Sequence, residues 1–341
     1  MKIIWYYFVK MYMRLGFAFY FKKIRVVGLE NIPKKKAILF VSNHQNALID
    51  PLLIATLCPR ELNFLTRAGV FGNSLIKALL SSVNMLPIYR MGDGLNNLHK
   101  NEEIFQKCYK ILGEKGTILI FPEGNHNIQR RVRALSKGFT RIVFGALQRN
   151  PELEIIVLPI GINYSNAKKY ASSVSIYFGE PISVNEPKVG EEINAASADL
   201  RIKVSAAMKK LTTHIENQED YAQIIKSFKE EDFLYPEKVN KKINTTKEFV
   251  PRSEELNNPF NFLTPIVKVN SFFPLLIWKY VYPKIDEEEF ISTFKFSIGI
   301  TAFPFFYLLQ SWLIYLLLGN NYAISYLILS FLSVYLFTKS K

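Results

Sequence analysis

The sequence is poor in the residues that build disulfide frameworks and metal cages. Its 341 residues include two cysteines, at positions 58 and 108, and four histidines, at positions 44, 99, 126 and 214. Two distant cysteines exclude a disulfide-stabilised small domain and a thiolate-rich metal site. Scattered histidines do not indicate a metal cage, so we expect no metal site. The chain also lacks internal repeats and low-complexity tracts.

Acidic residues are scarce relative to basic ones. The chain has 29 Asp and Glu against 43 Lys and Arg, which gives a net charge of +14. This surplus suits a nucleic acid, an anionic lipid or an acidic substrate carrier equally well. Because 49% of the residues are apolar and 14% are aromatic, a disordered polyelectrolyte is excluded. No nucleic-acid-binding motif is present, and the apolar distribution favours lipid.

Charge is absent from the 42 residues between Phe296 and Phe337. One membrane-spanning helix needs about 20 apolar residues, so this stretch is long enough for two. Gly319-Asn320-Asn321 interrupts it, and we predict two antiparallel spans, 296–318 and 322–337, in a transmembrane hairpin unit of residues 296–341. Lysines flank the hairpin at both ends, which predicts that both ends face the cytoplasm. The alternative is a buried helical hairpin in a soluble core.

Acidic residues are also absent from residues 1–23, which contain nine aromatic and five basic residues. Lys10 and Arg14 share one helical face. The pattern predicts an interfacial helix lying among lipid headgroups; a helix packed on its own domain is the alternative. Residues 259–284 are apolar and contain four prolines, so we expect residues 259–295 to form a segment on the membrane surface. Residues 217–258 are charged and predict a solvated helix and linker.

The segment 24–216 alternates short β-type runs with helical patterns. This alternation predicts an α/β domain with a mostly parallel sheet flanked by helices. The expected strands are 37–42, 63–66, 84–89, 117–121, 155–162 and 174–178, and the expected helices are 51–57, 98–112, 139–149 and 195–216.

Polar residues follow several of these predicted strands. His44 and Asp50 follow the first, Arg90 follows the third, and Glu123 follows the fourth. The crevice beyond the carboxyl ends of parallel strands is the usual ligand site, and these residue types suit acid–base work on an anionic substrate. Asp50-Pro51 has the pattern of a helix N-cap followed by a first helical proline. Asp50 is therefore expected to start a helix beside His44, or to act only as its cap.

Four segments occur in the order of the four blocks of the glycerolipid acyltransferase superfamily, which this chain resembles over roughly residues 20–215. They are Ser42-Asn43-His44-Gln45-Asn46-Ala47-Leu48-Ile49-Asp50, Leu86-Pro87-Ile88-Tyr89-Arg90, Phe121-Pro122-Glu123-Gly124 and Val157-Leu158-Pro159-Ile160. The flanks Val27–Pro33 and Lys137-Gly138 agree as well. Two features depart from the pattern: five residues separate His44 from Asp50 instead of four, and Asn125-His126-Asn127 replaces the usual Thr-Arg-Ser.

The resemblance implies roles for individual residues. His44 would be the general base, and Asp50 would hold its imidazole. Arginine from the cluster at positions 130, 131 and 133 would replace the missing phosphate ligand. The implied substrate-binding residues are Asn43, Arg90, Glu123, Gly124, Arg130, Arg131 and Lys137.

The resemblance further implies a membrane-bound O-acyltransferase that converts 1-acylglycerol-3-phosphate to phosphatidate in phospholipid biosynthesis. The acyl donor would be acyl-CoA or acyl-carrier protein, with membrane lipid as partner and no cofactor. A glycerol-3-phosphate, lysolipid or aminolipid acyltransferase and an inactive membrane-anchored lipid-binding protein are the alternatives. We expect the catalytic domain on the cytoplasmic face of a bacterial membrane, with the hairpin acting only as a tether and residues 1–23 and 259–284 flanking the pocket entrance.

Overall fold

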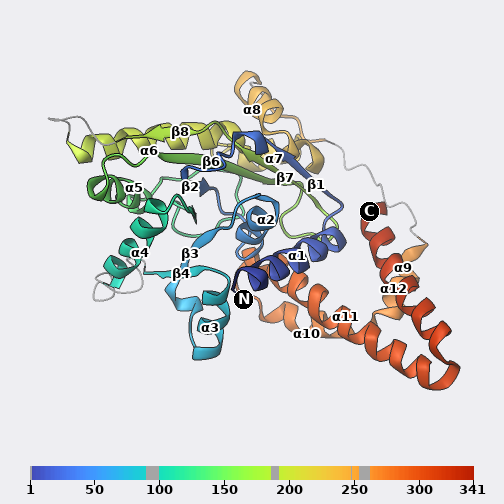
Figure 1. Ribbon diagram of the computed structural model, residues 1–341. Helices are drawn as coiled ribbons and strands as arrows, with labels where there is room; N and C mark the ends of the chain where they lie inside the picture. Colours follow the sequence, from blue (N-terminus) through green and yellow to red (C-terminus); the bar gives the residue numbers. More distant parts are fainter. Residues whose placement is uncertain (1, 90–99, 186–191, 247, 253–261) are drawn as a thin grey trace.

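A computed structural model describes residues 2–89, 100–185, 192–246, 248–252 and 262–341 (Figure 1). Its centre is an eight-stranded sheet in the order β1-β7-β6-β2-β5-β3-β4, with β8 also paired to β6. All pairings are parallel except those of β6 with β7 and β8. The prediction of a mostly parallel sheet is confirmed. The strands are β1 Lys23–Val27, β2 Ala37–Ser42, β3 Asn63–Arg67, β4 Met85–Ile88, β5 Thr117–Ile120, β6 Ile155–Tyr164, β7 Ser173–Phe178 and β8 Ile182–Val184.

Helices cover both faces of the sheet, as Figure 1 shows. The α-helices are α1 Lys2–Tyr20, α2 Ile49–Leu57, α3 Ser74–Ser82, α4 Asn101–Gly113, α5 Gly138–Arg149, α6 Ile193–Leu211, α7 Tyr221–Lys226, α8 Pro236–Thr245, α9 Leu263–Asn270, α10 Phe272–Val281, α11 Ile291–Leu318 and α12 Asn320–Ser340. Strand β2 shows how the core divides: Ile38 and Phe40 pack with α1 and α2, whereas Leu39 and Val41 pack with α4, α5 and α6. Alternate side chains of a strand point to opposite faces, so β2 is buried on both sides.

The segment 217–258 differs from the expectation of a solvated helix and linker. A 3₁₀ turn at Glu230–Leu234 buries Phe233 and Leu234, and α8 buries Val239. The Ser175 hydroxyl of β7 donates to the Leu234 carbonyl over 2.9 Å. The few apolar residues of this charged segment are therefore enough to fix it against the sheet.

Helix α1 carries two apolar stripes. Tyr6 and Phe17 are buried in the domain, whereas Phe8 and Met11 are exposed at 62% and 69%. Lys10 does not belong to an exposed basic face, because its ammonium donates to the Cys58 carbonyl at the C-terminus of α2 over 2.6 Å. A cation there satisfies an unpaired helix-end carbonyl. The helix is thus packed on its own domain and also offers an apolar outer stripe.

Helices α11 and α12 meet at Gly319, which has φ +90°, so the predicted break in the charge-free stretch lies at that residue. The first helix, counted from Glu288, and the second are each long and apolar enough to cross a membrane. Most of both helices is exposed in the structure, which differs from a buried hairpin of a soluble core.

The hairpin is docked on the α/β domain at both of its ends. Phe296 of α11 is 2% exposed and stacks on Phe17 with ring centroids 4.4 Å apart. At the end of α12, Lys339 donates to the Phe21 carbonyl, just past α1, over 2.7 Å. The first turn of the hairpin therefore contributes to the apolar core, and its expected role as a tether stays a prediction.

Candidate active site

The structure brings His44 and Asp50 together beyond the carboxyl end of β2. Nδ1 of His44 lies 2.8 Å from Oδ2 of Asp50. Asp50 is fully buried, and the His44 side chain is 11% exposed. A ring held at Nδ1 presents Nε2 as its proton acceptor. Within the part of the chain that the structure describes, no side chain or backbone group hydrogen-bonds to that Nε2.

The loop between the two residues curls around the Asp50 carboxylate. The backbone N–H groups of Gln45 and Asn46 donate to Oδ2 over 2.8 and 2.7 Å. Helix α2 begins at Ile49 and has Leu48 as its N-cap, so the expectation that Asp50 caps the helix is wrong. Asp50 sits inside the first turn, and the longer loop supplies the two N–H donors that fix its carboxylate.

Tyr164, at the last position of β6, completes the surroundings of Asp50. Its hydroxyl donates to Oδ1 over 2.6 Å. Burial and the Asp50 carboxylate raise the pKa of Tyr164 well above its usual value, so the phenol stays a donor. The sequence reasoning missed this residue because the strand was expected to end at position 162. A polar aromatic two positions beyond a buried strand end was the available signal.

Aromatic rings fix the His44 imidazole on two sides. The Phe121 ring stacks on it at 4.0 Å and 20°, and the His126 ring meets it edge-on at 5.6 Å. His126 in turn contacts Phe290, and its Nε2 lies 2.7 Å from a Glu287 carboxylate oxygen. The start of the C-terminal helices therefore borders the site, which the sequence did not indicate.

Glu123 and Arg133 form a partly buried ion pair next to His44. Nη2 and Nε of Arg133 donate to Oε2 of Glu123 over 2.7 and 3.1 Å, and the same guanidinium contacts Asn125. Burial raises the pKa of Glu123, although Arg133 and His44 oppose that shift. The Arg133 side chain is 25% exposed, so its outer edge reaches solvent. Among the cluster of three arginines, this is the one that the structure places at the site.

Two predicted substrate-binding residues have internal partners instead. The Asn43 amide exchanges two hydrogen bonds with the backbone of Ile162, at 2.9 and 2.8 Å. Arg130 donates to the Ser165 carbonyl over 2.9 Å and lies 3.8 Å from the Phe233 ring centroid. Burial lowers the pKa of Arg130 to about 10. Both side chains thus hold segments around the site together, and their roles in substrate binding stay predictions.

The remaining predicted residues are placed as follows. Gly124 has φ +83°, and a Cβ there would meet nothing within 4 Å, so backbone conformation and not close packing requires glycine. Arg131 is exposed within electrostatic range of His214, and Lys137 is exposed at the N-cap of α5. Their roles in substrate binding stay predictions. Arg90 lies outside the described residues.

One group of side chains has the composition of a cation site. The ligand atoms of His126, Glu287 and Glu289 lie within 4.8 Å of one another. Glu287 is 60% exposed and already pairs with His126. The three residues are at the rim, beside the His44 ring and not between it and Asp50.

Part of this chain is similar to known proteins. Residues 23–163 match the acyltransferase family model. Glycerol-3-phosphate O-acyltransferase 2 of Saccharomyces cerevisiae is 31% identical over 125 residues, 36% of this chain and 16% of that protein. A probable 1-acyl-sn-glycerol-3-phosphate acyltransferase of Mycoplasma pneumoniae is 26% identical over 145 residues, 41% of this chain and 52% of that protein.

The chain is also similar to the crystal structure of the 1-acyl-sn-glycerophosphate acyltransferase PlsC from Thermotoga maritima, with a TM-score of 0.43 and 18% identity over 60% of this chain and 79% of that one. The match spans about half of the Mycoplasma relative and about a sixth of the yeast relative. The matched segment contains β1 to β6, the His44–Asp50 pair and Glu123. Residues 23–163 therefore form an acyltransferase domain of the glycerolipid acyltransferase superfamily.

Proposed function

We propose that this protein transfers a fatty acyl group from a thioester to the hydroxyl of a phosphorylated glycerolipid acceptor, with 1-acylglycerol-3-phosphate as the acceptor and phosphatidate as the product. The observation that carries the proposal is the His44–Asp50 pair at the carboxyl end of β2, with Nδ1 held at 2.8 Å and Nε2 left for substrate. An alcohol is a weak nucleophile, and a positioned imidazole is the side chain that most often activates it.

The reaction follows from this arrangement. Nε2 of His44 takes the proton as the acceptor oxygen attacks the thioester carbonyl carbon. The C–O bond forms, the C–S bond breaks, and the proton passes to the departing thiolate, so the products are an ester and a free thiol. Asp50 stabilises the imidazolium formed in between. This chemistry needs no cofactor and no acyl-enzyme, in keeping with the burial of both cysteines.

The ion pair beside His44 supports a phosphorylated acceptor. Glu123 and Asn125 accept from four of the five guanidinium N–H groups of Arg133, which leaves one Nη1 N–H for a ligand, and the side chain is 25% exposed. This N–H and the guanidinium charge suit a single charge-assisted contact to a phosphate oxygen. Arg131 and Lys137 are exposed and add to the positive charge of this part of the surface.

Membrane attachment is part of the proposal. Two helices long and apolar enough to span a bilayer, together with the outer stripe of α1, suit a substrate whose chains lie in a membrane. We place the catalytic domain on the cytoplasmic face of a bacterial membrane, where acyl-CoA and acyl-carrier protein are available. A glycerol-3-phosphate acceptor is the second candidate, because the yeast relative is named for that substrate.

The acceptor is tested by incubating the purified full chain with labelled acyl-CoA or acyl-carrier protein and one acceptor at a time. We expect transfer to 1-acylglycerol-3-phosphate, and slower transfer to glycerol-3-phosphate and to uncharged monoacylglycerol. Arg133→Gln should raise the apparent acceptor constant by about tenfold or more, because a charge-assisted contact is worth about 1.5–3 kcal/mol. Transfer to no phosphorylated acceptor with either donor would contradict the proposal and favour an inactive lipid-binding protein.

A further inference from the structure

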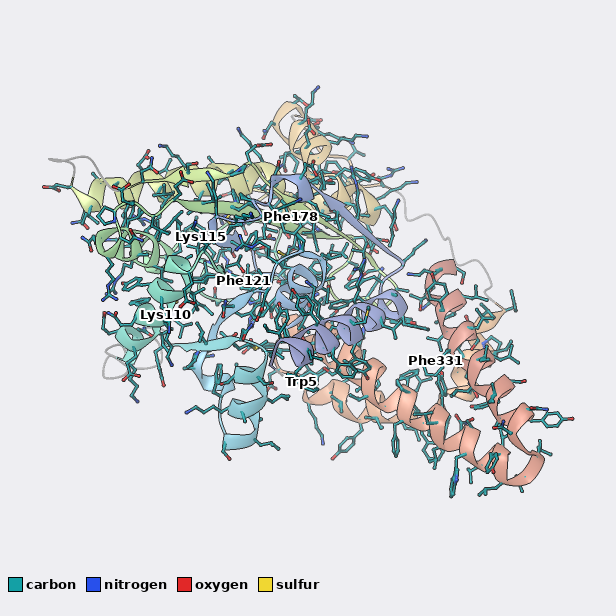
Figure 2. All side chains as sticks on the ribbon, in the orientation of Figure 1. Trp5, Lys110, Lys115, Phe121, Phe178 and Phe331 are labelled. Carbon is teal, nitrogen blue, oxygen red and sulfur yellow. The ribbon has the colours of Figure 1, made fainter. Side chains whose placement is uncertain are left out.

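An apolar groove lies between α1 and the C-terminal helices, away from the His44–Asp50 pair. Its volume is about 360 Å³, and nearly all of its lining is apolar. Every long element of the region contributes, with Leu15 from α1, Leu275 from α10, Phe303 from α11 and Val334 from α12. Phe331, labelled in Figure 2, projects from α12 and contacts Phe19 and Tyr307. Neither His44 nor Asp50 lines the groove.

Three lysines lie at this groove. Lys268 comes from α9, Lys295 from the start of α11, and Lys341 follows α12. Lys341 is within electrostatic range of both other ammonium groups. Lys295 donates to the Lys168 carbonyl over 2.8 Å and lies 5.1 Å from the Trp278 ring centroid. In the described parts of the chain, no ion pair joins any of the three ammonium groups to a side-chain carboxylate.

We propose that this groove binds one anionic membrane phospholipid, with an acyl chain along the apolar lining and the phosphodiester between Lys268, Lys295 and Lys341. The positive charge of the three lysines complements an anionic headgroup, because ammonium groups near a membrane surface attract anionic lipid. The position of the lysines along the hairpin also supports the proposal, because the start of α11 and the end of α12 lie at the same end of the hairpin. The groove extends from that end between exposed apolar helices. The volume is in the range of small-molecule sites, about 300–1,000 Å³.

The bound lipid would join parts of the chain that are far apart in sequence. It would contact α1, α9, α10, α11 and α12 at once, and the hairpin's first turns complete the domain core through Phe296. The site is distinct from the proposed catalytic site, so its occupancy is measured without any reference to acyl transfer.

Tryptophan fluorescence measures the occupancy directly. The chain has three tryptophans, and Trp278 lines the groove. The full chain carrying Trp5→Phe and Trp312→Phe is purified in an uncharged detergent and titrated with phosphatidylglycerol or phosphatidylcholine whose chains are brominated. We expect phosphatidylglycerol to quench Trp278 at a mole fraction about tenfold lower than phosphatidylcholine does, because lysines near a membrane surface attract anionic headgroups.

Two variants and one control distinguish binding of the lipid headgroup from binding of the acyl chain. Lys268→Gln/Lys295→Gln/Lys341→Gln should abolish the tenfold preference, whereas the charge-matched Lys23→Gln/Lys279→Gln/Lys284→Gln, all exposed and outside the groove, should preserve it. Gly299→Leu should weaken quenching by both lipids, because Gly299 lines the groove and a Cβ there meets nothing within 4 Å. The comparison is made only with variants whose thermal unfolding midpoint equals that of the unsubstituted protein.

Equal quenching by the two lipids, or a preference that survives the triple groove substitution, would overturn the headgroup site. Full quenching in folded Gly299→Leu would overturn the placement of the chain in the groove.

Discussion

Asp50 is the residue on which the geometry of the site depends most. Its two carboxylate oxygens accept from the His44 ring, from two backbone N–H groups and from the Tyr164 hydroxyl, all within a fully buried setting. A carboxylate is the side chain that accepts four such bonds. The motif therefore needs aspartate for both the orientation of the base and the shape of the loop.

Asp50→Asn should lower both activity and stability. An asparagine amide has one acceptor oxygen, so its NH₂ group would face a donor, and an unsatisfied buried donor costs about 1–3 kcal/mol. We expect a lower thermal unfolding midpoint in detergent and a fall in transfer of about 100-fold. Tyr164→Phe removes a single donor and should cost less in both measurements. Unchanged stability in Asp50→Asn would show that the carboxylate does not organise the loop.

Glu123 should make stability depend on pH. Burial raises the pKa of its carboxyl above the ordinary value of 4.5, so the folded state holds the proton more tightly than the unfolded state. Stability from this group is then present below the ordinary value and decreases as the pH rises through the folded pKa. Thermal midpoints of the wild type and Glu123→Gln, measured between pH 4 and 8, should diverge in this sense. Parallel profiles would mean that Arg133 compensates the burial fully.

At the scale of elements, the contact between the C-terminal hairpin and the domain has a direct consequence. Phe296 is buried against Phe17 and Tyr20, whereas Phe305, on the same helix, is 70% exposed. Phe296→Ala should destabilise the protein by about 3–5 kcal/mol, as expected for a buried phenylalanine. Phe305→Ala is the matched control and should leave the midpoint nearly unchanged. Equal midpoints for the two variants would contradict the docking of α11 on the core.

The sequence predicts a helix or strand well where a continuous apolar run is buried, and poorly where the element is short, charged or exposed. The six expected strands match β2 to β7 because their apolar runs are continuous. Strands β1 and β8 and helix α3 were missed: β1 begins with charged residues, β8 has three residues, and α3 has no buried residue. The His44–Asp50 pair was predictable from its motif. Tyr164 and Glu287 were not, because their partners at the site are more than 100 residues away in the sequence.

At the scale of the whole molecule, a hairpin that spans a membrane would place the α/β domain and residue 341 on one side and the Gly319 turn on the other. Both native cysteines are buried, and burial raises the pKa of the Cys108 thiol to about 12 and that of Cys58 as well, so their background reactivity is low.

Single cysteines therefore report the topology. In sealed vesicles, a membrane-impermeant maleimide should label Lys110→Cys, on the exposed surface of α4, and Asn321→Cys, at the hairpin turn, from opposite sides. Detergent should make both accessible. Labelling of both from the same side in intact vesicles would contradict a spanning hairpin and favour one lying on the surface.

The proposed role of His44 as the base for acyl transfer is tested by the turnover of His44→Ala, measured beside that of His126→Ala. The two rings are 5.6 Å apart, so the pair distinguishes the imidazole held by Asp50 from the one held by Glu287. With labelled acyl thioester and 1-acylglycerol-3-phosphate, we expect His44→Ala to lose about 10²–10⁴-fold in turnover while folding normally. His126→Ala should lose less than about tenfold, because its ring only borders the base. A folded His44→Ala protein that keeps more than about a tenth of wild-type turnover would contradict the account.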